Sequence, residues 1–131
     1  MLLVKTKVAP SSIAGLGLFA VEFIPKGSVI WRFEKTFDVS LSEENYSSLK
    51  KNPAFDSMDP YIYRSIITGN YIVCSDNARY INHSWQANTA DKPGENGTLT
   101  IATSDIQPGE EITSNYELFD ADFDKERDQY K

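Results

Sequence analysis

Turn-forming residues separate short, β-like patterns along this chain. Residues 25–27 (Pro-Lys-Gly) and 107–109 (Gln-Pro-Gly) each have the composition of a tight turn, and Gly69-Asn70 separates two segments rich in tyrosine and isoleucine. Between these turns, residues 98–104 alternate apolar and polar side chains, as a half-buried strand does. The sequence therefore predicts a mainly β domain with several short sheets and little helix.

Other local signals place the remaining elements. Ser40 and Glu43 have the spacing of a capping box, which predicts one short helix from Leu41 to about Lys50. Gly69-Asn70 predicts a hairpin with a two-residue turn. A loop is expected over residues 52–60, one helical turn running into a loop over 76–84, and strands over residues 2–8, 18–21, 28–33, 61–68, 71–75 and 110–116.

Length and composition limit the class of protein. A chain of 131 residues, of which 40% are hydrophobic and 24% charged, is typical of one globular domain. No apolar run approaches the ~20 residues of a membrane span, and the first residues do not resemble a signal peptide. We therefore expect an intracellular protein that does not bind membranes, cytoplasmic or, in a eukaryotic host, nuclear.

The charge of the chain bears on its partners. The net charge is −6, whereas proteins that bind nucleic acid directly present a basic face to the phosphates. We therefore expect no direct binding of nucleic acid. The negative charge fits a partner with a basic, lysine-rich segment, although many proteins are acidic only for solubility.

The chain has one cysteine, Cys74, and one histidine, His83. A single cysteine excludes an internal disulfide and a cysteine-rich zinc cluster, and Cys74 is expected to be a small buried apolar residue. No His-x-x-x-His or Glu-x-x-His spacing surrounds His83, so we expect no metal site.

Three separated motifs carry the functional signal. They are GLGLFA at residues 15–20, ARYINHSWQAN at 78–88 and IQPGEEITSNY at 106–116. The first lacks the third glycine and the following helix of a dinucleotide-binding fingerprint. Considered alone, the polar residues of the second would serve to satisfy buried backbone groups.

Together, in this order and at these distances, the motifs closely resemble those of the SET-domain protein lysine methyltransferases. The resemblance covers about residues 3–118, so residues 1–118 are expected to form the SET domain and residues 119–131 a short acidic tail. The resemblance implies a β-clip fold in which the Asn-His segment passes through a loop near the C-terminus, giving a knot-like crossing.

The same resemblance implies the site residues and the cofactor, S-adenosyl-L-methionine. Tyr116 matches the closing tyrosine of the family and would be the catalytic residue, with its hydroxyl near the transferred methyl group and the incoming amine. Asn82 would contact the methionine end of the cofactor and His83 the adenine. The full set of cofactor-binding residues implied is Gly15, Leu16, Gly17, Leu18, Tyr80, Asn82, His83 and Tyr116.

Departures from the family pattern leave parts of this prediction open. Trp85 and Ala87 replace the usual cysteine and proline, and Ser114 stands where many members have an aromatic residue that sets the number of methyl groups added. The zinc-binding cysteines that often follow the domain are missing. Phe119 or Phe123 would then fold back as an aromatic wall, or a second subunit or the substrate would close the site.

The expected function is methyl transfer from S-adenosylmethionine to a lysine ε-amine of a protein substrate. The alternative is a non-catalytic SET-like module that binds a basic partner through its acidic surface; a non-protein amine as methyl acceptor is a weaker option. The oligomeric state is open, and a dimer is one of the options.

Overall fold

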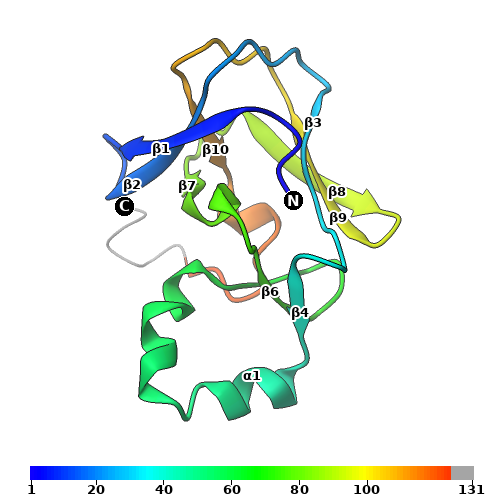
Figure 1. Ribbon diagram of the computed structural model, residues 1–131. Coiled ribbons are helices and arrows are strands. Elements are labelled where there is room, and N and C mark those ends of the chain that lie inside the picture. The colour runs from blue at the N-terminus through cyan, green and yellow to red at the C-terminus, as the bar shows by residue number, and fades with distance from the viewer. Residues whose placement is uncertain (125–131) are drawn as a thin grey trace.

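The computed structural model describes residues 1–124, which form three small sheets with short helical segments between them (Figure 1). The strands pair in the orders β1-β2-β10-β7, β3-β9-β8 and β4-β6-β5. Their bounds are β1 Thr6–Pro10, β2 Leu16–Ala20, β3 Val29–Arg32, β4 Val39–Leu41, β5 Tyr63–Arg64, β6 Tyr71–Val73, β7 Asn82–His83, β8 Thr89–Gly94, β9 Gly97–Ala102 and β10 Glu111–Ser114. The helical segments are α1 Glu43–Leu49, η1 Pro53–Ser57, η2 Asp59–Tyr61, η3 Asn77–Tyr80 and η4 Tyr116–Leu118.

The first sheet brings the three sequence motifs side by side. Strand β10 pairs antiparallel with β2, with Ile112 opposite Leu18, and parallel with β7, with Ser114 opposite His83. Residues of the first, second and third motifs therefore occupy three neighbouring strands, although up to about 100 residues separate them along the chain.

Two hydrophobic clusters hold the sheets together. The larger cluster lies where the first and second sheets meet, because strands β2 and β10 of the first sheet and β3 and β9 of the second each contribute buried apolar side chains to it. The smaller cluster lies between the second and third sheets and contains Trp31, Phe33 and Ile72. Members of the larger cluster are Leu18, Ala20, Ile24, Ile30, Ala102, Ile106 and Ile112.

The mainly β class predicted from the sequence is confirmed, with one α-helix within the described residues. In Figure 1 this helix, α1, lies at the end of the molecule away from β1 and β2. It begins two residues later than the capping box predicted: Ser42, not Ser40, accepts the bond from the Asn45 N–H. Ser40 is instead an extended residue of β4 opposite Ile72, and extended pairing competes with a capping role.

Other local predictions were wrong in detail. Residues 52–60 are not a plain loop, because η1 and η2 occupy them, and Asn52 and Pro53 start η1 as a cap and first residue. The hairpin at Gly69-Asn70 exists, but its loop runs over residues 65–70, since Arg64 pairs with Tyr71. The helical turn within residues 76–84 is confirmed as η3, whereas the strands β7 and β8 were missed.

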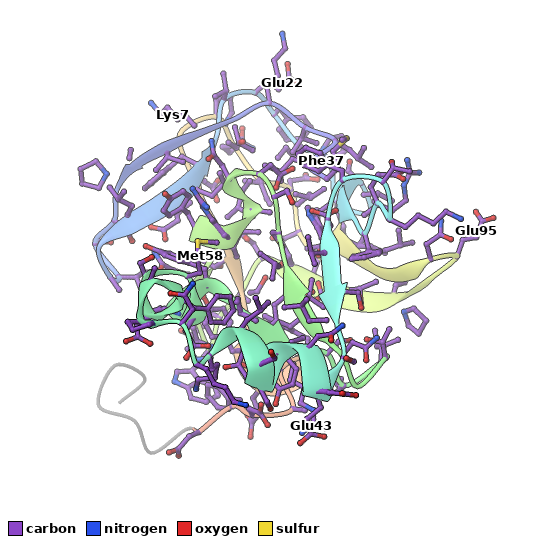
Figure 2. The ribbon with its side chains drawn as sticks, turned by 60° about the horizontal axis from the view of Figure 1, so that its bottom comes forward. Lys7, Glu22, Phe37, Glu43, Met58 and Glu95 are labelled. Atoms are coloured by element: carbon purple, nitrogen blue, oxygen red, sulfur yellow. The ribbon has the colours of Figure 1, made fainter. Side chains whose placement is uncertain are left out.

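Charged side chains lie mainly at the periphery of the fold. Figure 2 shows Lys7, Glu22 and Glu95 projecting outward, and Glu43 does so from α1. No helix within residues 1–124 is long and apolar enough to cross a membrane.

Removing buried volume at the joint between β2 and β10 should destabilise the fold. Leu18 is 0% exposed, so Leu18→Ala is expected to lower the free energy of unfolding by about 2–5 kcal/mol through lost burial and the cavity it leaves. Leu49→Ala, on the exposed side of α1, is the matched control and should change it by less than ~1 kcal/mol. Urea unfolding of both variants measures the difference, and equal losses would contradict this account of the core.

Candidate functional site

The side-chain amide of Asn82 connects all three motifs. Its Nδ2 donates to the carbonyl oxygens of Ala14 at 3.1 Å and Leu16 at 3.0 Å, and to Oε2 of Glu111 at 3.0 Å. Glu111 also accepts a bond of 2.7 Å from the Ser11 hydroxyl. The amide and this carboxylate therefore fix the loop before β2 against β7 and β10.

Gly15 and Gly17 lie in the loop at the start of β2, residues 14–17, which we call the glycine loop, and they have different surroundings. A Cβ at Gly17 would lie 2.7 Å from Oε2 of Glu111, so a side chain here would displace the carboxylate that binds Asn82. Gly15 has φ +46° and nothing within 4 Å of such a Cβ. Leu16 is 46% exposed, whereas Leu18 is 0% exposed and lies in the core between β1 and β10.

His83 is buried beside the closing tyrosine. Its Nδ1 accepts the Tyr116 N–H at 3.0 Å, so in the neutral ring the proton resides on Nε2. Burial lowers the pKa of His83 below 6.5, while the charge of Glu117 acts in the opposite direction. At neutral pH the imidazole is therefore an uncharged acceptor that holds the backbone of Tyr116.

Aromatic rings surround this histidine. Trp85 meets the ring edge-on, with centroids 4.4 Å apart, and Phe123 lies 5.4 Å from it. Phe123 also contacts Trp85 at 5.9 Å. The described start of the acidic tail thus packs against the histidine, whereas the part of the tail over residues 125–131 lies outside the described residues.

Tyr116 is held at three points. Its hydroxyl donates to the carbonyl oxygen of Ile81, its N–H binds His83, and its ring lies edge-on to Phe119 with centroids 5.4 Å apart. These contacts fix the phenol in a single orientation. They also join the closing tyrosine to the residue immediately before Asn82.

Tyr80 lies apart from the other sequence-predicted site residues. Its ring packs edge-on against Tyr61 at 5.5 Å, and its hydroxyl accepts a 3.4 Å bond from Arg79. The guanidinium of Arg79 lies over both rings, 5.1 Å from Tyr80 and 5.8 Å from Tyr61. The structure thus brings together Asn82, His83, Tyr116 and the glycine loop, and groups Tyr80 with a different aromatic set.

A cavity of about 580 Å³ opens beside Tyr116. Its size is that of a small-ligand site. Tyrosines, acidic residues and a few cations dominate its walls. The residues that line it are Trp31, Tyr46, Lys50, Asp59, Pro60, Tyr61, Ile62, Tyr63, Arg64, Tyr71, Cys74, Ala78, Arg79, Ile81, Asp91, Thr100, Ser114, Tyr116, Phe119, Asp120 and Asp122.

Ser114, a departure from the family pattern, lines this cavity. Its hydroxyl lies 2.9 Å from Oγ1 of Thr89. Cys74 is buried as predicted, and burial raises the pKa of its thiol.

Asp91 is the acidic residue that sequence reasoning missed. It accepts a 2.7 Å bond from the Thr100 hydroxyl on the facing strand β9. Burial raises the pKa of the Asp91 carboxyl to about 6, although the bond from Thr100 acts to lower it. No motif surrounds Asp91 in the sequence, and its place in the cavity follows only from the pairing of β8 with β9.

Two polar groups in the cavity walls add to its character. Within residues 1–124, Nε1 of Trp31 and Nε of Arg79 are buried without a hydrogen-bond partner. A buried donor without a partner lowers the stability of a protein by about 1–3 kcal/mol, so such donors are rare in a hydrophobic core. The described residues contain no group of three or more His, Cys, Asp or Glu side chains arranged to hold a metal ion.

Comparison with known proteins identifies the family. The SET-domain family matches residues 15–117. A chain of ctPRC2, in an autoinhibited conformation bound to S-adenosylmethionine, superposes with a TM-score of 0.65 at 24% identity, over 88% of this chain and 16% of that one. A Plasmodium falciparum protein described as a candidate histone methyltransferase superposes with a TM-score of 0.60 at 23% identity, over 86% and 93% of the two chains. A search of curated proteins finds no match.

The fold and the site define the class of protein: a β-rich domain whose three motifs lie on neighbouring strands, with a cavity beside the closing tyrosine. The chain belongs to the SET-domain family. The family implies S-adenosylmethionine as cofactor, and the glycine loop fits such a ligand. Gly15 faces open space, and Leu16 and Trp85 are 46% and 45% exposed, which leaves apolar surface for a ligand to cover.

Removing the charge of Asp91 should stabilise the isolated protein at neutral pH. Because the pKa of this carboxyl is about 6 in the folded state and ordinarily 3.8, the native state carries a penalty above pH 6 that is relieved as the pH falls toward 4. Asp91→Asn keeps an oxygen for Thr100 and should raise the free energy of unfolding by about 1–3 kcal/mol at pH 7.5.

Denaturant unfolding of wild type and variant measures this difference at both pH values. The gain should shrink to below about 1 kcal/mol by pH 4, where the carboxyl is protonated in the folded state and partly so in the unfolded state. A variant that is no more stable than wild type at pH 7.5 would contradict the assigned burial cost.

Proposed function

We propose that this protein transfers the methyl group of S-adenosylmethionine to a lysine ε-amine of a protein substrate. Family membership supports methyl transfer in general. The observation that carries the finer proposal is the position of Tyr116, which lines the cavity and is bonded through its hydroxyl and N–H to Ile81 and His83. One residue thereby connects the motif-bearing strands with a cavity that can hold a substrate side chain.

The lining of the cavity supports a cationic, flexible substrate group. Four aspartates and a series of tyrosines line it, and aromatic faces attract ammonium groups. The net charge of −6 adds long-range attraction for a basic protein segment. A lysine side chain has both features that these walls favour: an aliphatic stem and a charged amine.

Tyr116 and the cavity would prepare the amine for transfer. The bound cofactor supplies an electrophilic methyl group. A lysine amine must be neutral to attack, and its ordinary pKa is about 10.4; desolvation in the cavity disfavours the ammonium form. The Tyr116 hydroxyl donates a hydrogen bond to the Ile81 carbonyl, and its oxygen would accept an N–H of the amine and so orient the nitrogen.

Cofactor contacts would come from the segments that Asn82 fixes. The backbone of residues 15–17 and the segment containing His83 would hold the ligand, and Asn82 would act by keeping the loop in place. Phe119 and Phe123 would form the aromatic wall that closes the site: Phe119 lines the cavity and packs on Tyr63 at 5.0 Å, and Phe123 packs on His83.

A non-catalytic module that binds a basic partner would use the same acidic cavity. Such a module would not need the orientation of the Tyr116 hydroxyl. Labelled-methyl transfer to mixed core histones, as a lysine-rich probe, distinguishes the two functions, because the module would give cofactor binding or partner binding without transfer.

Removing the Tyr116 hydroxyl should slow transfer. Tyr116→Phe keeps the ring contacts but loses the oxygen that orients the amine, so kcat is expected to fall at least ~10-fold, equivalent to ~1.4 kcal/mol of transition-state stabilisation. Calorimetry should find cofactor affinity within a few-fold of wild type. Full activity in the variant would remove Tyr116 from the catalytic role.

Removing the Asn82 amide should weaken cofactor binding by releasing the loop. Asn82→Ala deletes three bonds and leaves two carbonyls without their donor, so we expect affinity for S-adenosylmethionine to fall roughly 5- to 150-fold. Asn45→Ala, on the exposed surface of α1, is the matched control and should bind as wild type does. An unchanged affinity in a folded Asn82→Ala protein would exclude this site.

A further inference from the structure

We propose that Asp91 is the residue that recognises the positive charge of the substrate, its carboxylate pairing with the cationic end of the side chain that enters the cavity. The inference deepens the proposed function, on which it rests for the identity of that side chain as lysine. It assigns a substrate-binding role to a residue outside all three sequence motifs.

The position of Asp91 is set by strand geometry. Asp91 and Thr89 are two residues apart on β8 and therefore project to the same face of the sheet. Thr89 contacts the Ser114 hydroxyl at 2.9 Å, and Ser114 precedes Tyr116 by two residues at the end of β10. Asp91 thus lies in the same cavity as Tyr116, about 7 Å along β8 from the contact with Ser114.

The other charges of the cavity have partners of their own. The Asp120 carboxylate accepts the backbone N–H groups of Arg64 at 3.2 Å and Asp122 at 3.1 Å. Lys50 pairs with Asp59 at 3.4 Å, and Arg64 lies 3.9 Å from both Glu43 and Asp122. The guanidinium of Arg79 lies over the rings of Tyr61 and Tyr80.

Asp91, by contrast, takes part in none of the ion pairs within the described residues. Its carboxylate accepts a hydrogen bond from the uncharged Thr100 hydroxyl. Its carboxylate is therefore the anion of the cavity that a cationic ligand would complement.

Energetics favour a ligand cation at this place. A half-buried carboxylate without a cation is held at a cost, which the raised pKa of Asp91 reflects, and a substrate ammonium entering the same cavity also loses hydration. Each charge offsets the desolvation of the other when they pair, so the pair serves substrate binding. Because a carboxylate favours the ammonium form, the amine leaves this pair and loses its proton to water before it attacks the methyl group. A purely structural acid bonded to Thr100 would gain nothing from such a ligand, so binding experiments separate the two roles.

The first test needs neither cofactor nor turnover. The n-butylammonium ion reproduces the end of a lysine side chain, and n-butanol is its uncharged analogue. Titration of each into 15N-labelled protein at pH 7.5, followed by amide shifts around the cavity, should give at least ~10-fold tighter binding of the ammonium than of the alcohol. Asp91→Asn should abolish that preference, while Asp56→Asn, on the exposed surface of η1, should retain it.

An equal preference in wild type and Asp91→Asn, or no ammonium binding by wild type, would overturn the inference. Because Asp91→Asn is expected to be at least as stable as wild type, loss of binding cannot be ascribed to unfolding, and the amide spectrum verifies this.

The second test separates this inference from the proposed function. In transfer to core histones, Asp91→Asn should raise KM at least ~10-fold with a smaller change in kcat, since the carboxylate binds the substrate and Tyr116 orients the amine. Transfer by wild type with an unchanged KM in the variant would overturn the role of Asp91 alone. Asp91-dependent ammonium binding without any transfer would overturn the methyltransferase proposal and leave the cation site standing.

Discussion

The amide of Asn82 is the contact on which the arrangement of this site depends. A single NH₂ group binds the loop before β2 through two carbonyls and β10 through Glu111, while Asn82 itself begins β7. Strands of two and four residues have little pairing energy of their own. The side-chain bonds of Asn82 and the core beneath Leu18 and Ile112 therefore fix the order β2-β10-β7 together.

The cavity has the opposite character to the core beside it. Strands β2, β9 and β10 bury aliphatic side chains in the larger cluster, where every group is apolar. The cavity instead contains the carboxylate of Asp91 and the unpartnered donors of Trp31 and Arg79. Such groups lower the stability of a folded chain, and a domain keeps them where a ligand uses them. This contrast locates function in the cavity independently of the sequence motifs.

Features that depend on residues adjacent in the sequence could be predicted. Features that depend on which strands pair in the folded protein could not. Gly15, Asn82 and Tyr116 were recognised because each lies within a contiguous motif, and β9 because its side chains alternate. Asp91 was not recognised, since its place in the cavity arises from the pairing of β8 with β9, and β8 begins in a polar segment and contains Pro93. The surroundings of Tyr80 were equally hidden in the sequence, because they depend on how η3 places its ring against Tyr61, and its role as a cofactor contact stays a prediction.

The two halves of the site are mechanically coupled through Tyr116. Its N–H depends on Nδ1 of His83 and its hydroxyl on the carbonyl of Ile81, and both residues flank Asn82. A displacement of the glycine loop would act on Asn82, then on its two neighbours, and so on both ends of the tyrosine. Because the ring of Tyr116 also forms part of the cavity wall, the loop and the cavity cannot rearrange independently. The bonds that position Tyr116 therefore couple the glycine loop to the cavity. A ligand bound at the loop would act on the shape of the cavity, and a ligand in the cavity would act on the loop.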